Sequence, residues 1–307
     1  MDKNIKILIT GIGGFIGSSL ESHIRKNYPL WKIYGIDIKG NPDHGIFNIN
    51  MSYNNEKLKS LLTRLRPRYI FHFAGAVSNS NFEQLLRSNI LTTYSLLFAI
   101  QHIKGYSPRI IIPSSASEYG NVSRLHLPVG EDYPLKPINM YGFSKMMQTR
   151  LSLMFAEYGL DVVIARIFNI SGKGIGTNFS IGKFASEIAQ IKKKKQKPVL
   201  ITKSLGARRD FLDIQDICKC LLVVALNGKK GQVYNICRGK SFLIRDLLSK
   251  LIDISGLCGI KIVEDKTGSQ CEIFDSFGST AKLRKIFKIF EPISIEESLK
   301  NTYFSQF

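Results

Sequence analysis

Tyr141 and Lys145 stand four residues apart, so on a helix the phenol and the ammonium would share one face. A cation beside the phenol would lower the phenol pKa from its usual value of about 10 toward neutral pH. Tyr141 could then exchange a proton with a hydroxyl or a ketone while a hydride moves to or from a redox cofactor. Such pairs are common by chance on helix faces, so the interpretation depends on where the fold places them.

Hydroxyl side chains follow an apolar, strand-like segment at residues 109–114, in the run Ser114-Ser115-Ala116-Ser117. Parallel strands present their carboxyl ends at one edge of a sheet, where ligands bind. Serines at a strand end also form ordinary turns, so alone they indicate little. Tyr141 and Lys145 follow the same strand, and this position gives weight to their interpretation as a pair for proton transfer.

A glycine fingerprint lies near the N-terminus, where Gly11, Gly14 and Gly17 follow a strand-like segment and open an amphipathic helix. This context separates the motif from an ordinary strand-to-helix turn. Gly11 permits a tight turn, Gly14 lets backbone N–H groups approach a pyrophosphate, and Gly17 allows close packing of helix on strand. The fingerprint predicts a dinucleotide cofactor.

Asp37 ends the next strand-like segment, 20 residues after Gly17. A carboxylate there can accept both hydroxyls of an adenosine ribose and would repel a 2′-phosphate. NAD(H) is therefore the expected cofactor, and the nearby Lys39 leaves some tolerance for NADP(H). The alternative is a solvated acid at a strand end.

The elements that must position these residues alternate between short apolar runs and amphipathic helices up to about residue 170, as in a parallel sheet covered on both faces. The expected strands are Ile5 to Thr10, Lys32 to Asp37, Tyr69 to Ala74, Arg109 to Ser114 and Asp161 to Phe168. The expected helices are Phe15 to Lys26, Glu56 to Arg66, Phe82 to Ile103 and Tyr141 to Tyr158. After residue 169 the rhythm degrades into mixed elements, with strands at Val199 to Thr202 and Val233 to Cys237 and a helix at Ile244 to Ile254.

These elements predict an α/β fold, a Rossmann-type, doubly wound parallel sheet with a smaller C-terminal α/β lobe. Residues 1–170 would form the cofactor domain, which also carries Ser115, Tyr141 and Lys145. Residues 171–307 would mainly bind the substrate.

Composition narrows the class of partner. The net charge of +19 would attract phosphates and anionic surfaces of any kind. The basic run 192–195 ends a helical segment, where cations are favoured, and no aromatic-interleaved groove accompanies it, so nucleic acid is not expected.

The five cysteines form no Cys-x-x-Cys pair and no His stands at zinc-ligand spacing, so neither a metal nor a disulfide framework is indicated. No apolar run approaches the roughly 18 residues of a membrane span, and the first strand leaves no room for a signal peptide, so we expect a cytoplasmic protein without membrane contact.

Together, motifs spread in order over nearly the whole chain resemble the extended short-chain dehydrogenase/reductases, which include NAD-dependent epimerases, dehydratases and 4-ketoreductases of nucleotide-sugars. These motifs are Gly11-x-x-Gly14-x-x-Gly17, Phe73-Ala74-Gly75, Asn89, Ser114-Ser115, Tyr119-Gly120, Tyr141-x-x-x-Lys145, Arg166-x-Phe168-Asn169 and Arg209-Asp210-Phe211. The second half, and Glu118 before Tyr119, are most similar to the GDP-6-deoxy-mannose reductases within that family.

The resemblance implies a role for each matched position. Ser115 would hydrogen-bond the reacting oxygen, Tyr141 would be the acid/base, and Lys145 would hold the nicotinamide ribose and tune Tyr141. The positions expected at the cofactor are Gly11, Gly14, Phe15, Ile16, Gly17, Asp37, Asn48, Ile49, Ala74 and Lys145. The positions expected at a nucleotide-diphosphate-sugar are Ser115, Ser117, Asn169, Ser180 and Arg209, the last gripping the diphosphate.

Two departures from the family matter. Where the 4,6-dehydratases carry an Asp-Glu pair this chain has Ala116-Ser117, so dehydration is disfavoured. Where the family tends to place a second phosphate-binding Arg, near residue 269, only Lys266 is at hand, so the nucleotide stays open.

The alternatives share most of the site. Reduction of a nucleotide-linked 4-keto-6-deoxyhexose by NAD(P)H is the main hypothesis, and a C4 epimerase that keeps its NAD would use the same residues. A non-catalytic dinucleotide sensor would have no reason to retain Ser115, Tyr141 and Lys145 together. The resemblance also implies a homodimer that pairs through the helices 82–103 and 141–158. The apolar residues expected to supply its contact include Leu96, Leu97, Met147 and Leu151, some of which must also face the sheet.

Overall fold

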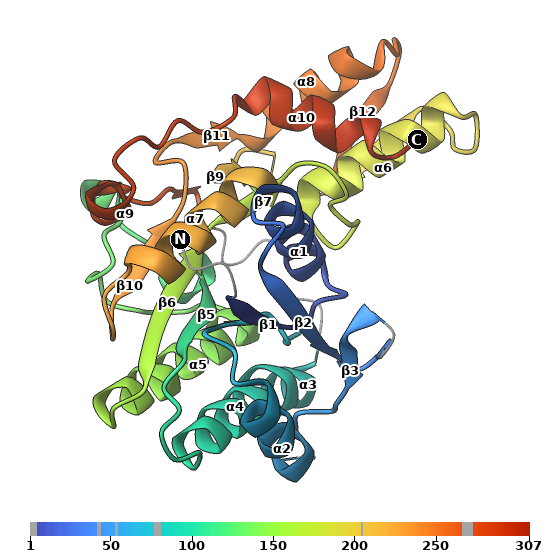
Figure 1. The fold of residues 1–307 in the computed structure, drawn as a ribbon. Coiled ribbons are helices and arrows are strands. Elements are labelled where there is room, and N and C mark those ends of the chain that lie inside the picture. Colours follow the sequence, from blue (N-terminus) through green and yellow to red (C-terminus); the bar gives the residue numbers. More distant parts are fainter. Residues whose placement is uncertain (1–4, 42–43, 53–54, 77–80, 204, 266–272) are drawn as a thin grey trace. The chain divides into compact units, whose positions relative to one another are not determined.

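The computed structural model describes residues 5–41, 44–52, 55–76, 81–203, 205–265 and 273–307. Its central sheet has seven strands in the order β10-β6-β5-β4-β1-β2-β3, so the chain starts in the middle, moves to one edge, and returns to fill the other side (Figure 1). The strands are β1 Lys6–Thr10, β2 Lys32–Asp37, β3 Ile46–Asn48, β4 Tyr69–His72, β5 Arg109–Ser115, β6 Asp161–Ile167 and β10 Val233–Ile236. Strand β1 pairs in parallel with both β2 and β4, which confirms the predicted doubly wound, Rossmann-type sheet.

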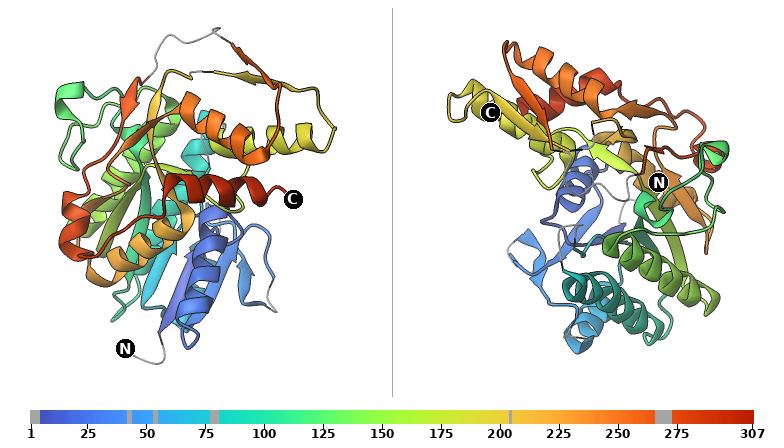
Figure 2. Two further views of the ribbon diagram at one scale, coloured as in Figure 1. Left: turned by 90° about the horizontal axis from the view of Figure 1, so that it is seen from above. Right: turned by 180° about the vertical axis from the view of Figure 1, so that it is seen from behind.

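Helices cover both faces of this sheet. They are α1 Phe15–Asn27, α2 Asn55–Leu65, α4 Thr92–Gln101, α5 Met140–Glu157 and α7 Ile214–Asn227. Side chains of α2, α4 and α5 share one buried apolar cluster with alternate residues of the strands, such as Leu8 and Ile70, while α1 and α7 lie on the other face (Figures 1 and 2). Because strands covered on both faces need apolar residues throughout, β4 is buried at every position, and this continuous pattern made the strands readable in the sequence.

The helix expected from Phe82 to Ile103 is interrupted. Its segments are α3 Phe82–Leu85, a π-helical turn at Leu86–Leu91 and then α4. Within this region the Thr93 hydroxyl donates to the Asn89 carbonyl at 2.6 Å, and the Thr92 hydroxyl donates to the Ser88 carbonyl. A one-residue expansion of a turn leaves the apolar spacing on either side intact, so the sequence pattern could not reveal it.

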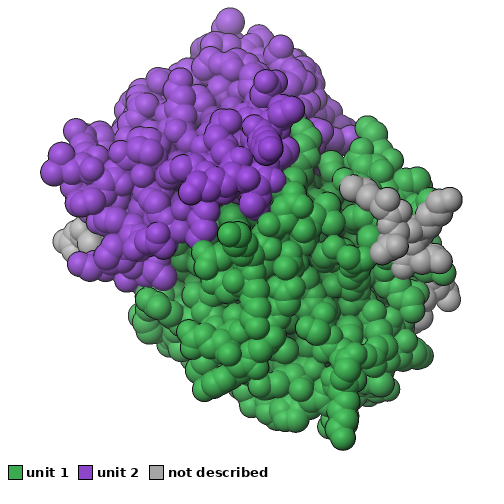
Figure 3. All heavy atoms as spheres, turned by 60° about the vertical axis from the view of Figure 1, so that its left-hand side comes forward, with its two compact units in different colours: residues 1–118, 139–166, 218–234 green, residues 119–138, 167–217, 235–307 purple. Residues whose placement is uncertain are grey.

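The chain divides into two compact units, each assembled from three segments (Figure 3). The first unit comprises residues 1–118, 139–166 and 218–234, and the second comprises residues 119–138, 167–217 and 235–307. It stays a proposal that residues 1–170 bind the cofactor and that residues 171–307 mainly bind the substrate.

The second unit has a core of its own. Its four-stranded sheet consists of β7 Asn169–Ser171, β9 Arg208–Asp213, β11 Ser241–Leu243 and β13 Asp275–Ser276, and a two-stranded sheet pairs β8 Val199–Thr202 with β12 Lys261–Glu264. Its helices are α6 Ser180–Lys192, α8 Ile244–Ser255, α9 Ala281–Ile286 and α10 Ile295–Phe304. Apolar side chains of α6, α8 and α10 pack together with Phe211 of β9. Two short 3-10 turns, Ala116–Glu118 in the first unit and Arg124–His126 in the second, complete the described elements.

The described residues contain no helix that is long and apolar enough to cross a membrane. They also contain no cluster of three or more His, Cys, Asp or Glu side chains placed to hold a metal ion.

Candidate active site

The glycine fingerprint forms the turn between β1 and α1 in the first unit. Gly11 has a φ of +66°, and a Cβ at Gly17 would lie 2.3 Å from the Gly11 carbonyl oxygen. Both positions therefore require glycine, as the sequence predicts. Gly14 caps α1 in an extended conformation, and no side chain makes a capping hydrogen bond there. The N-terminus of a helix suits a phosphate.

Asp37 stands at the end of β2, beside this turn. Its carboxylate accepts a hydrogen bond from the Gly13 backbone N–H at 2.9 Å and a longer one from the Lys39 N–H at 3.4 Å. The side chain is thus already oriented toward the glycine turn by the protein itself.

A cavity of about 780 Å³ opens at this edge of the first unit. Among the residues expected at the cofactor, its lining includes Gly11, Gly14, Asp37, Ile49 and Ala74. The other expected positions, which are all described, lie outside the lining; they are Phe15, Ile16, Gly17, Asn48 and Lys145.

The proposed catalytic side chains come from β5 and α5, also in the first unit. Helix α5 begins after Asn139, whose side chain accepts from the Gly142 N–H at 2.7 Å, and this cap fixes the first turn, which carries Tyr141. The Ser115 side chain, at the end of β5, lies in hydrogen-bonding reach of the Tyr141 phenol. The structure therefore brings Ser115, Tyr141 and Lys145 to one place.

The Tyr141 phenol departs from the sequence-based expectation. Its pKa is raised from 10.0 to about 12, chiefly by burial, with Ser115 lowering it and the Glu118 charge raising it. Lys145 was expected to depress this pKa, but burial has the largest effect and the groups that shift the pKa are Ser115 and Glu118. Tyr141 is consequently protonated at neutral pH when only the groups of the protein act on it.

Lys145 is buried, and its ammonium donates to the side-chain oxygen of Gln148 on the next turn of α5. Burial lowers the pKa of Lys145 from 10.5 to about 8, and the negative charge of Glu118 opposes that shift. The Gln148 amide in turn donates to the Thr93 hydroxyl at 2.7 Å.

The hydrogen bonds continue across the sheet to the start of the glycine turn. The Thr93 hydroxyl lies 3.0 Å from Nε2 of His72, whose Nδ1 lies 2.8 Å from the Thr10 hydroxyl. Burial, and then the charge of Lys145, lower the pKa of His72 from 6.5 to about 3, so this imidazole is neutral. The chain of polar contacts thus joins the catalytic helix to the residue that precedes Gly11.

Asn89, in the π-helical turn, connects two loops of the site. Its side-chain oxygen accepts from the Ala76 N–H at 2.9 Å, and its amide donates to the Ser144 hydroxyl at 3.0 Å. That hydroxyl donates to the Tyr141 carbonyl at 2.8 Å. The turn therefore holds the segment after β4 against the helix that bears Tyr141.

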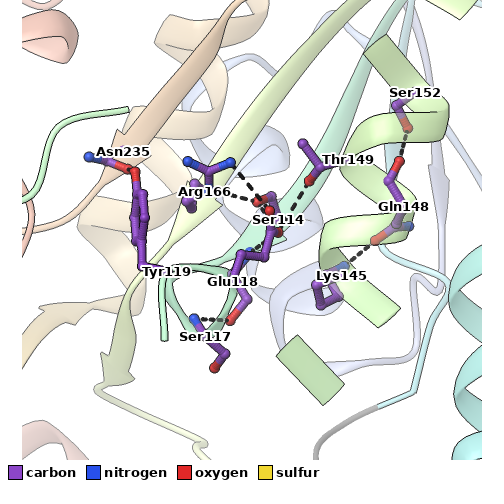
Figure 4. Close-up of polar contacts among 11 residues, drawn as sticks. Ser114, Ser117, Glu118, Tyr119, Lys145, Gln148, Thr149, Ser152, Arg166 and Asn235 are labelled. Atoms are coloured by element: carbon purple, nitrogen blue, oxygen red, sulfur yellow. Dashed lines mark hydrogen bonds and ion pairs between the residues drawn. The ribbon is translucent and has the colours of Figure 1, made fainter. Parts of the chain in front are cut away.

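A buried ion pair lies next to Ser115, whose backbone N–H donates to its carboxylate. Glu118 and Arg166, both almost fully excluded from solvent, approach to 3.2 Å between Oε2 and Nη2 (Figure 4). In the sequence, Glu118 and Arg166 stand out only as parts of motifs, and neither His72 nor Gln148 was expected in the site. The usable signal is a polar residue inside an apolar strand, as with His72 in β4 and Arg166 in β6.

The residues expected at the substrate are distributed over both units. In the first unit, the Ser117 N–H donates to the Ser115 hydroxyl at 3.2 Å. In the second, Asn169 begins β7 and donates to the Asp210 carbonyl at 3.1 Å, Ser180 begins α6, and Arg209 lies half-buried in β9. Lys266 lies outside the described residues.

Comparison with known proteins identifies the family of this chain. The sequence model of the NAD dependent epimerase/dehydratase family matches residues 7–237. GDP-6-deoxy-D-mannose reductase of Pseudomonas aeruginosa is 29% identical over 301 residues, covering 96% of this chain and 95% of the relative. GDP-6-deoxy-D-talose 4-dehydrogenase of Aggregatibacter actinomycetemcomitans is 26% identical, covering 82% of this chain and 80% of the relative. The structure of RMD from Pseudomonas aeruginosa in complex with NADPH is similar with a TM-score of 0.87 and 28% identity, covering 98% of both chains.

Proposed function

Because the chain belongs to the NAD-dependent epimerase/dehydratase family, we propose that it reduces the C4 keto group of a nucleotide-linked 4-keto-6-deoxyhexose with NAD(P)H. The observation that carries the proposal is the grouping of Ser115, Tyr141 and Lys145 in the unit that holds the glycine turn. The relatives named above act as a reductase and a 4-dehydrogenase of 6-deoxy-sugars, so they agree with this class of reaction.

The first unit fits a dinucleotide. Gly11 lets the glycine turn lie close to the backbone after β4, since a Cβ at Gly11 would lie 2.7 Å from the Ala74 nitrogen. The cavity beside the turn is lined by Asp37 and Ile49. Gly14 and the N-terminus of α1 would hold the pyrophosphate, and Asp37 the adenosine ribose. When bound, NAD(P)H supplies the hydride.

The protein's own groups then complete the reduction. The Ser115 hydroxyl would donate a hydrogen bond to the ketone oxygen and polarise it, and Tyr141 would give its proton to that oxygen as C4 receives the hydride. A phenol pKa of about 12 keeps Tyr141 protonated, which is the state an acid needs at the start of a reduction. Lys145 would steady the phenolate that remains.

We propose NAD(H) as the preferred cofactor, because the Asp37 carboxylate would meet a 2′-phosphate with like charge. Lys39, which lines the same cavity, is the group that would permit NADP(H). The related RMD structure contains NADPH, so direct titration of both reduced cofactors is needed to decide the preference.

The proposed substrate contacts are Ser115, Ser117, Asn169, Ser180 and Arg209. The guanidinium of Arg209 suits a diphosphate because it can donate two parallel hydrogen bonds. We also propose a cytoplasmic homodimer.

The decisive assay incubates the protein with NADH or NADPH and a panel of GDP- and dTDP-linked 4-keto-6-deoxyhexoses. A reductase consumes one reduced nicotinamide for each sugar reduced. A C4 epimerase instead interconverts the 4-hydroxy sugars without net consumption, and a dinucleotide sensor turns over neither.

A further inference from the structure

Glu118 is a carboxylate with no exposure to solvent, placed in the short turn that follows β5. A buried charge is costly unless partners compensate it. Arg166, on β6, provides the opposite charge at 3.2 Å and is itself buried. The ion pair therefore occupies the interior of the first unit, next to Ser115.

Each Glu118 oxygen has partners from different elements (Figure 4). Oε1 accepts from the Ser115 backbone N–H at 3.0 Å, from the Thr149 hydroxyl at 3.1 Å, and from the Ser114 hydroxyl. Oε2 accepts from Arg166, whose Nε also donates to the Ser114 hydroxyl at 3.2 Å.

These contacts connect the two elements that carry the catalytic groups. Ser115 ends β5, and Thr149 lies one turn after Lys145 on α5. One carboxylate oxygen thus bonds the backbone of Ser115 and the helix of Tyr141 and Lys145 at once. A shift of Glu118 would change the position of Ser115 relative to that helix.

The charge of Glu118 also acts on both titratable catalytic groups, raising the pKa of Tyr141 and that of Lys145. The charged or titratable neighbours are Arg166 from β6 and Tyr141 and Lys145 from α5. His72, from β4, faces Lys145 and is neutral at the pH of the reaction, because its pKa is about 3. Glu118 is therefore an anionic group that acts on both catalytic residues.

We propose that Glu118 is a positioning residue for proton transfer, which fixes Ser115 through its backbone N–H and keeps the Lys145 ammonium charged. The inference rests on the proposed function for its kinetic part, since the reaction supplies the readout. Arg166 pairs with Glu118 in the interior at 3.2 Å, so the two side chains act as a unit.

The variant E118Q separates charge from shape, because glutamine keeps an acceptor oxygen for Ser115 and Thr149 but carries no charge. Losing the charge lowers the pKa of both Lys145 and Tyr141, so the alkaline limb of the rate of ketone reduction should move to lower pH, by on the order of one unit. Thr149→Val is the matched control, since it removes a hydrogen bond to the same carboxylate and leaves the charge, so its alkaline limb should coincide with that of the wild type. An E118Q profile that superposes on the wild-type profile would overturn the proposal.

A second measurement does not depend on turnover. Titration of the Lys145 side chain by NMR on carbon-13-labelled lysine, assigned through Lys145→Met, should show the same downward shift in E118Q. If the wild type reduces no keto-sugar and the NMR shift is present, the proposed function fails and the charge effect of Glu118 stands. If the wild type is active and Lys145 titrates identically in both proteins, the proposal is wrong.

Should E118Q fail to fold, E118D decides the question. Aspartate keeps the charge but is one methylene shorter, so the alkaline limb should stay in place while misplacement of Ser115 lowers kcat about tenfold or more. An E118D protein with wild-type kcat would exclude a positioning role.

Discussion

Tyr141 combines a raised pKa with a hydrogen bond to Ser115 and a place one turn before Lys145 on the same helix. Burial keeps its phenol protonated at neutral pH, with the pKa near 12, and an acid of this kind is suited to completing a hydride addition to a ketone. In the reverse reaction the positive charge of an oxidised nicotinamide would favour the phenolate. The direction of the reaction and the charge state of the phenol are thus linked.

Tyr141→Phe should abolish turnover, since it removes the acidic hydroxyl and retains the ring. Proton transfer by a positioned acid contributes typically about 10²- to 10⁴-fold in rate, so single-turnover hydride transfer should fall by that order. Cofactor affinity, measured by titration, should hardly change. Lys145→Met is the companion variant, because it should reduce both turnover and cofactor affinity. Retention of more than about a tenth of the wild-type rate by Tyr141→Phe would remove Tyr141 from the acid/base role.

Arg209→Ala should weaken binding of the nucleotide-sugar and leave NAD(P)H binding nearly intact. A charge-assisted bidentate contact contributes about 1.5 to 3 kcal/mol, which corresponds to a loss of roughly tenfold or more in affinity. Calorimetric titration with the nucleoside diphosphate alone measures it. Equal affinity in both proteins would mean that other groups hold the phosphates.

The elements of the first unit differ in how far the sequence defines them. Strands β1, β2 and β5 and helix α5 could be predicted because they show continuous apolar runs or regular helical spacing, bounded by Gly, Ser or Asn caps. The π-helical turn that bears Asn89 could not be predicted, because one extra residue in a turn leaves no periodic pattern. In the second unit, β8 was expected at Val199 to Thr202, whereas β7, β11 and β13 could not be predicted, because strands of two or three residues are too short to show an alternation. The positions of Ser115, Tyr141 and Lys145 were readable, whereas the pKa of Tyr141 and the pairing of Glu118 with Arg166 depend on burial between distant segments.

The buried chain from Thr10 to Lys145 predicts a specific pH dependence of stability. The pKa of His72 falls from 6.5 to about 3 on folding, so the unfolded chain binds the proton more tightly. Its contribution to the free energy of unfolding is therefore present above pH 6.5 and is lost as the pH falls from 6.5 toward about 3, by up to about 1.4 kcal/mol per pH unit.

Urea unfolding of the wild type and of His72→Gln across that pH range tests this prediction. The glutamine can still hydrogen-bond but cannot take up a proton, so its unfolding free energy should depend less on pH. The comparison is needed because Asp210, whose pKa is raised by burial to about 6, titrates in the opposite sense in part of the same range. Parallel curves for the two proteins would show that His72 does not titrate as described.

At the scale of the whole molecule, the expected homodimer needs a revised set of contact residues. Leu96 and Leu97 are fully buried in the core of the first unit, so they cannot supply a contact between subunits, and Met147 and Leu151 are partly buried. The large apolar side chains that α4 and α5 expose are instead Tyr94, Phe98, Met140, Phe143 and Met154, at 40%, 39%, 60%, 39% and 42%. Leu96 and Leu97 face the core from α4, and the exposed side of the same helix carries Tyr94 and Phe98.

Sedimentation velocity should show a dimer at micromolar concentration for the wild type and a monomer for Phe98→Glu, because a carboxylate would be buried against an apolar surface. Leu125→Glu, at a residue that is 91% exposed in the second unit, is the matched control and should stay dimeric. A wild-type monomer at that concentration would refute the dimer.

Hydride transfer to the sugar is the central claim, and isotope transfer tests it most directly. The protein is incubated with a nucleotide-linked 4-keto-6-deoxyhexose and with NADH or NADPH that carries deuterium at C4 of the nicotinamide, using each diastereomer in turn. The account predicts that one diastereomer delivers deuterium to C4 of the sugar, giving one labelled 4-hydroxy product for each cofactor oxidised, and that Tyr141→Phe fails to do so. A 4-hydroxy product without deuterium at C4, or no product from any of the keto-sugars, would contradict the account.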